Sequence, residues 1–146
     1  MDAQTPCPED SAMPSNTFAF VGTLNRAMPD FPPARGAGIA TFRFDEESGR
    51  MTFSSSYDGI DNPSFIALDA AGRHLYACTE WAGRNEGLVA ALDIDPEDGS
   101  LSYINMQPTL GSIACHVSPD RAGALLFAAN FTIAPEGARP GQAVVA

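Results

Sequence analysis

The chain alternates between short apolar runs and polar turns that contain aspartate and glycine. The turns are DEESG (45–49), DAAG (69–72), DPEDG (95–99) and DRAG (120–123), and these two residue types favour the tight turns that join β-strands. No stretch sustains the 3.6-residue spacing of an amphipathic helix. The apolar runs therefore predict strands over residues 18–23, 38–44, 51–57, 64–68, 74–79, 88–94, 101–106, 113–118 and 124–130.

These runs and turns recur along the chain. Residues 38–53 align with residues 88–103 at an offset of 50, and residues 63–80 align with residues 114–131 at an offset of 51. Each repeat contains four short strands, which is typical of a β-propeller blade and excludes arrays of helical repeats. A third repeat begins at Gly141, where GQAVVA restarts the pattern. We therefore predict an all-β, antiparallel, open propeller arc with two complete four-stranded units and flanking strands.

The first sixteen residues differ in composition from the rest. Residues 1–16 are polar and acidic and contain proline, without the positive start and apolar stretch of a secretory signal. We expect a disordered tail over 1–16 and one folded domain over 17–146. The three cysteines have no C-x-x-C spacing, which favours reduced thiols in a cytoplasmic protein over a disulfide framework. Cys78 and Cys115 are expected to be small buried residues.

Charge and hydropathy restrict the classes of partner. Eight arginines, no lysine and 18 carboxylates give a formal net charge of −10, whereas binding of nucleic acid needs a basic surface. No apolar run approaches the roughly 18 residues that would suggest a membrane span. Hydrophobic residues make up 45% of the chain, which is enough for a packed core. We therefore expect neither a nucleic-acid partner nor a membrane partner.

Four segments in this order and spacing resemble the lactonase family of β-propellers, which includes bacterial 6-phosphogluconolactonases and carboxymuconate-cyclising enzymes. The segments are FVGT (20–23), GIATFRFDEESGRMT (38–52), NPSFIALDAAGRHLYACTE (62–80) and ACHVSPDRAGALLFAAN (114–130). The resemblance extends over residues 18–146 and implies a seven-bladed propeller. At about 50 residues per blade, seven blades need about 350 residues. The chain is therefore expected to be an N-terminal fragment with about two and a half blades.

His116 is the first candidate for chemistry, because its equivalent in the preceding repeat is Phe65. From the residues alone, the imidazole could be packed in the core like that phenyl ring, or it could carry a proton. The resemblance favours the second reading, since the histidine of ACHVSPD matches one proposed as catalytic in these propellers. The resemblance also places the strand end at Glu80 on the central channel, as a substrate-binding candidate.

Two asparagines are further substrate-binding candidates. Asn62 precedes a strand and Asn130 ends one, and each could either bind a substrate or cap a turn. His74, in a GRH turn whose repeat equivalent is Leu125, is expected to be structural. We predict no metal site and no cofactor.

The resemblance implies that the complete protein hydrolyses 6-phosphoglucono-lactone, or a related sugar lactone, to the acid in the pentose phosphate pathway. The glutamate and arginine that assist the histidine in this family would lie beyond Ala146, and the sequence does not identify the arginines that would hold a phosphate. The alternatives are carboxymuconate cyclisation by the same histidine and a metal-dependent lactonase with Glu80 and Asn130 as oxygen ligands. From another class come a non-catalytic interaction propeller and an inactive remnant.

An incomplete ring leaves an apolar blade face uncovered. Propellers protect such faces by closing the ring, and a large uncovered apolar surface favours association. We therefore expect this chain on its own to be marginally stable, catalytically silent and prone to self-association.

Overall fold

The computed structural model describes residues 16–28, 33–81, 84 and 86–132. Nine β-strands and no helix lie within that part of the chain, so it contains no helix that could cross a membrane. The strands are β1 (Thr17–Gly22), β2 (Ile39–Phe44), β3 (Met51–Tyr57), β4 (Ile66–Leu68), β5 (His74–Cys78), β6 (Leu88–Ile94), β7 (Leu101–Pro108), β8 (Ser112–Pro119) and β9 (Leu126–Thr132). Every predicted strand is present, and all pairings are antiparallel.

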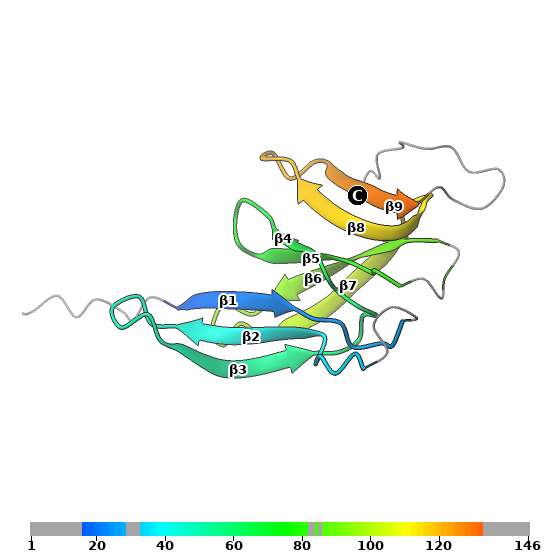
Figure 1. Cartoon of the computed structure of the whole chain (residues 1–146). Helices are drawn as coiled ribbons and strands as arrows, with labels where there is room; N and C mark the ends of the chain where they lie inside the picture. Colours follow the sequence, from blue (N-terminus) through cyan, green and yellow to red (C-terminus); the bar gives the residue numbers. More distant parts are fainter. Residues whose placement is uncertain (1–15, 29–32, 82–83, 85, 133–146) are drawn as a thin grey trace, which may run out of the picture.

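The strands form three separate sheets that follow one another like a fan (Figure 1). Blade 1 has the order β1-β2-β3, blade 2 has the order β4-β5-β6-β7, and blade 3 has β8-β9. This arrangement is an open arc of antiparallel blades, as predicted. The repeat predicted to begin at Gly141 and residues 1–15 of the predicted tail lie outside the described residues. The last residue of that tail, Asn16, donates hydrogen bonds to the carbonyl oxygens of Pro96 and Glu97.

The sheets do not begin at the same strands as the sequence repeats. Blade 2 combines the last two strands of one repeat with the first two strands of the next, since β5 pairs with β6 through Leu75 and Leu92. The predicted grouping of residues 38–79 as one sheet is therefore wrong. A repeat period fixes the spacing of equivalent strands but not the point at which a blade starts. In the described residues, β1 pairs with β2 and lies at the edge of blade 1.

Both faces of blade 2 are buried against neighbouring blades. On one face, side chains from β5 and β6 join blade 1 in a cluster that includes Leu75, Leu92 and Ile39, each with no exposed surface. On the other face, Cys78 and Val89 pack against Val117 of blade 3. Alternate residues of a strand point to opposite faces. Strands β5 and β6 are therefore apolar along most of their length, as expected for strands buried on both sides.

The turn DPEDG (95–99) of blade 2 rests on blade 1. The buried hydroxyl of Thr41 donates a 3.0 Å hydrogen bond to the carbonyl oxygen of Gly99. Ser54 donates to the carbonyl oxygen of Asp98 at 2.8 Å, and Arg43 donates to that of Glu97 at 2.9 Å. The turn thus supplies three main-chain acceptors to the neighbouring sheet and fixes how the two blades sit together.

Cys78 and Cys115 occupy different environments. Cys78 is fully buried between blades 2 and 3, and this burial raises the pKa of its thiol to about 12, with further contributions from Cys115 and Glu80. Cys115 lies at a register shift of β8 between Ala114 and His116, and its side chain is partly exposed. The expectation that both cysteines are buried is therefore wrong for Cys115, because the bulge turns it away from the core.

We expect Gly99→Ala to destabilise the chain more than Gly49→Ala. Both glycines have a left-handed backbone, with φ of 69° at Gly49 and 72° at Gly99, which costs an alanine about 1–2 kcal/mol. A β-carbon on Gly49 has open space, whereas one on Gly99 would lie 2.7 Å from the ring of Phe18 and 2.8 Å from Thr41. Urea unfolding of the two variants measures the difference, and equal losses would show that the turn does not lock the blades.

We expect iodoacetamide to alkylate Cys115 well before Cys78 in the folded chain. A pKa of about 12 leaves about a thousandfold less thiolate at Cys78 than an ordinary thiol near 9 would carry, and the side chain has no exposed surface. Peptide mapping by mass spectrometry follows both sites, and in urea their rates should converge. Rapid labelling of native Cys78 would contradict the blade 2–blade 3 packing.

Candidate functional site

The candidate site lies at one end of the blades, which we call the loop end. Strands β1 and β5 finish at this end, and the antiparallel pairing of β4 with β5 makes β4 start there. Strand β8 likewise starts where β9 finishes. The strands β4 and β8, which are the first strands of neighbouring sheets, contact each other. Residues that precede β4 and follow β5 are therefore gathered at one end of the molecule.

His116 is exposed on β8 and stacks against Phe65, which directly precedes β4. The two ring centroids are 4.2 Å apart and the ring planes are tilted by 38°. The bulge at Cys115 lets both Ala114 and Val117 point into the core, so that His116 between them points outward. The two residues that the sequence repeats align are thus in direct contact, and the imidazole lies on the surface rather than in the core.

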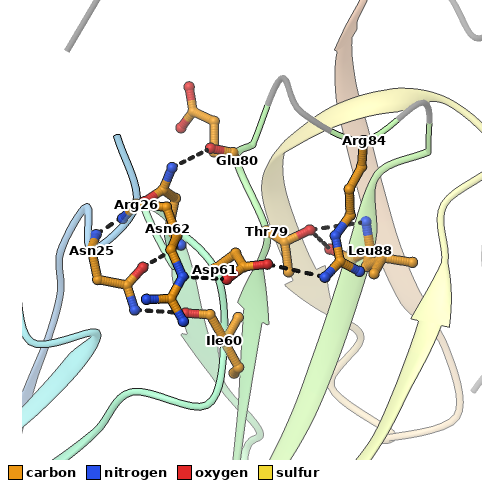
Figure 2. A network of polar contacts seen from close by, with 9 residues as sticks. All are labelled: Asn25, Arg26, Ile60, Asp61, Asn62, Thr79, Glu80, Arg84 and Leu88. Atoms are coloured by element: carbon orange, nitrogen blue, oxygen red, sulfur yellow. Dashed lines mark hydrogen bonds and ion pairs between the residues drawn. The ribbon is translucent and has the colours of Figure 1, made fainter. Parts of the chain in front are cut away.

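Asn62 is fully buried and its amide group ties three segments together (Figure 2). Its Oδ1 accepts hydrogen bonds from the backbone N–H groups of Asn25 at 3.0 Å and Arg26 at 2.7 Å. Its Nδ2 donates to the carbonyl oxygen of Glu80 at 3.1 Å. With φ of 47°, Asn62 has a left-handed backbone, which asparagine tolerates better than most residues. The geometry gives Asn62 a positioning role at the loop end.

Glu80 follows β5 and is held through its main chain rather than its carboxylate. Its N–H donates to the carbonyl oxygen of Asn62 at 3.0 Å, and its own carbonyl oxygen accepts from the Asn62 amide. The carboxylate points away from this network (Figure 2). Among the described residues, no hydrogen bond or ion pair joins the carboxylate to His116. The Glu80 carboxylate is therefore free to meet a ligand at the loop end.

Asn130 is engaged with the loop between β7 and β8. Its Oδ1 accepts a 2.6 Å hydrogen bond from the hydroxyl of Thr109, and its Nδ2 donates to the Thr109 carbonyl oxygen at 3.2 Å. The loop also approaches closely at Gly111, where a β-carbon would lie 2.4 Å from the Asn130 amide nitrogen. The amide groups of Asn130 and Asn62 thus both hold loop segments by hydrogen bonds. Among the described residues, neither amide group has a hydrogen bond to His116.

His74 is held in its turn by a carboxylate. Its Nδ1 lies 2.7 Å from Oδ2 of Asp69. Burial would raise the pKa of Asp69, but the hydrogen bonds from His74 and from the backbone N–H groups that follow outweigh it and leave the pKa lowered. This arrangement agrees with the structural role predicted for His74.

Two arginines that the sequence did not single out meet at the loop end. Arg26, which follows β1, places its Nε 2.8 Å from Oδ1 of Asp61, and Arg84, between β5 and β6, places an Nη 3.0 Å from Oδ2 (Figure 2). The guanidinium of Arg84 also lies over the Trp81 ring at 5.4 Å. These contacts join residues 35 and 23 positions apart, and no local sequence pattern predicts them.

The site therefore offers an exposed imidazole backed by an aromatic ring, a carboxylate with no partner in the described chain and a pair of guanidinium groups. An imidazole can take a proton from water, and a guanidinium can hold an anion. Within the described ranges, no group of three or more histidine, cysteine, aspartate or glutamate side chains is placed to hold a metal ion.

Comparison with known proteins identifies the fold. A 6-phosphogluconolactonase from Formosa agariphila is 35% identical over 113 residues, which are 77% of this chain and 30% of that protein. A 6-phosphogluconolactonase from Bacillus subtilis is 31% identical over 114 residues, which are 78% of this chain and 30% of that protein. This chain thus spans about 30% of the length of the curated relatives that it matches.

Solved structures agree. A candidate 6-phosphogluconolactonase from Bacteroides fragilis superposes with a TM-score of 0.68 at 29% identity, covering 88% of this chain and 32% of that one. The periplasmic gluconolactonase of Pseudomonas aeruginosa gives 0.66 at 26% identity, covering 80% and 31%. The family described as "Lactonase, 7-bladed beta-propeller" matches residues 18–138. The chain belongs to the seven-bladed lactonase propeller family.

Proposed function

We propose that the complete protein hydrolyses a sugar lactone, with 6-phosphoglucono-lactone as the first substrate to test and the pentose phosphate pathway as its expected setting. Family membership and the names of the relatives support this proposal. The observation that carries it is the exchange of Phe65 for His116 between equivalent repeats, which puts an exposed imidazole at the first strand of a blade. In a closed propeller, the first strands of the blades surround the central channel.

In this proposal, His116 acts as the general base. Neutral imidazole takes a proton from a water molecule, whose oxygen attacks the lactone carbonyl carbon. The carbonyl oxygen gains negative charge, the bond from carbon to the ring oxygen then breaks, and that oxygen takes up a proton to give the open acid. Phe65 holds the imidazole ring by stacking, and Glu80 contacts substrate hydroxyl groups. Asn62 and Asn130 remain predictions as substrate contacts, since their amide groups bind the chain itself.

The alternatives predict different outcomes in the same assays. A metal-dependent lactonase would use Glu80 and Asn130 as ligands, but the Oδ1 of Asn130 already accepts a hydrogen bond from Thr109 at 2.6 Å. Loss of activity in a chelator would nevertheless favour that reading. Carbon-bound deuterium in a product formed in D₂O would indicate cyclisation of a carboxymuconate, and a retained partner without turnover would indicate an interaction module.

The compartment is part of the proposal. We expect the protein in the cytoplasm, as the buried Cys78 thiol and the absence of close cysteine spacing favour, and fractionation tests this expectation. One structural neighbour is named as periplasmic, so the periplasmic fraction must be assayed too.

We expect His116→Asn to lower kcat about 10²–10⁴-fold in a complete protein that carries the ACHVSPD segment, because general-base assistance is typically worth that much. The side chain is exposed, so stability should change little. Lactone hydrolysis and thermal unfolding are measured on the same preparations. The limb of the pH–rate profile that reports base protonation should disappear in the variant.

His116→Phe is the matched control, because it copies the residue of the preceding repeat. This variant should fold and stack against Phe65, and it should lose activity to a similar extent as His116→Asn. Full activity in His116→Phe would mean that the imidazole serves packing alone.

We expect this chain on its own to self-associate through the face of β9 that points away from blade 2. Leu126 and Ala128 pack toward blade 2, so that Phe127 and Phe131 lie on the opposite face, where they are 47% and 76% exposed. No described residue covers that face. Replacing both phenylalanines by serine should shift sedimentation toward monomer, whereas Leu125→Ser, in the adjacent turn, should not. Unchanged association in the double variant would locate the contact elsewhere.

A further inference from the structure

Arg26 and Arg84 meet at Asp61 in a protein that is otherwise strongly acidic. The formal net charge is −10, and the chain has eight arginines and no lysine. Arg26 lies 2.8 Å from one oxygen of the Asp61 carboxylate, and Arg84 lies 3.0 Å from the other. Two guanidinium groups and one carboxylate leave one positive charge at this point. The Glu80 carboxylate does not cancel it by contact, because it points away from the ion pairs (Figure 2).

Asp61 accepts only two of the hydrogen bonds that the two guanidinium groups can donate. Arg26 contacts the carboxylate through Nε and Arg84 through one terminal nitrogen. Within the described residues, both terminal nitrogens of Arg26 and the Nε and second terminal nitrogen of Arg84 have no hydrogen-bond partner. The two arginine side chains are 55% and 44% exposed, whereas Asp61 is 18% exposed. The carboxylate thus holds two partly exposed guanidinium groups close together.

We propose that Arg26 and Arg84 form a subsite for the phosphate group of a phosphorylated sugar lactone, an inference that rests on the proposed function. A phosphate group carries several acceptor oxygens that match the donors of guanidinium groups bidentately. Asp61 is four residues before Phe65, which limits their separation to about 14 Å. The segment 61–65 thus connects the arginine pair to the ring that stacks on His116. Asp61 positions the arginines and does not itself contact the phosphate.

The test is direct binding of inorganic phosphate and glucose 6-phosphate to this chain, followed through the Nε–H signals of its arginines by NMR at constant ionic strength. Glucose serves as the unphosphorylated ligand. Arg26→Gln and Arg84→Gln should each weaken phosphate binding at least about tenfold, since a hydrogen bond to a charged group contributes about 1.5–3 kcal/mol. Arg50→Gln is the matched control, because Arg50 follows the turn after β2 at the opposite end of the blades and carries the same charge.

Asp61→Asn adds a second, independent variant. It removes the competing negative charge and keeps one acceptor oxygen for the arginines, so phosphate should bind more tightly. Saturable shifts of the Arg26 and Arg84 signals, lost in their Gln variants and retained in Arg50→Gln, would support the subsite. Equal effects of Arg26→Gln and Arg50→Gln, or no binding at millimolar phosphate by a chain whose thermal unfolding is normal, would overturn it.

The readout separates the subsite from the proposed function. Phosphate binding by this chain, together with no hydrolysis of any lactone by the complete protein, would support the subsite and reject the activity. Equal turnover of phosphorylated and unphosphorylated lactones, unaffected by Arg26→Gln, would reject the subsite and leave the lactonase assignment intact.

Discussion

Packing of one sheet against the next is the constraint on which the rest of this structure depends. Blade 2 buries Leu75 and Leu92 on one face and Cys78 and Val89 on the other, so neither face can be left in water without loss of stability. Burial of a leucine side chain contributes about 1.5–3 kcal/mol, and a sheet with two apolar faces obtains this only from two neighbours. The blades therefore stabilise one another, and no single blade is an independent unit.

Hydrogen bonds between adjacent blades fix the orientation in which their apolar faces pack. At one end of the blades, the DPEDG turn offers its carbonyl oxygens to Thr41 and its neighbours, which sets the angle between blades 1 and 2. At the opposite, loop end, the buried amide of Asn62 binds the segments after β1 and β5. The segment that carries Arg26 and the strand end that carries Glu80 are thus held to the same asparagine. The geometry of the loop end follows from the way in which adjacent blades are fastened.

Local features of this fold were predictable, and non-local ones were not. The Asp–Gly turns predicted the strand positions to within about two residues, because turn chemistry depends on neighbours in sequence. The largest shifts are the starts at Ile66 and Leu126 and the ends at Pro108 and Thr132. The grouping of strands into blades could not be predicted from the repeat, because the period is the same whichever strand is counted as the first. His116 stood out against its repeat equivalent, whereas Arg26 and Arg84 meet only after two blades have packed.

The stacking of Phe65 on His116 has a consequence for how such a site can change. Phe65 and His116 occupy the same place in successive repeats, and β4 and β8, the strands at which they lie, pack together. Each repeat therefore forms part of the environment of the next, and the chain can be compared with itself as if its repeats were homologues. Positions with the same residue in both repeats reflect the repeat symmetry. Positions where the residue differs, such as Glu80 and Phe131, depart from it. The surroundings of the histidine can thus be altered by mutation of the preceding repeat, without any change in the segment that carries the histidine.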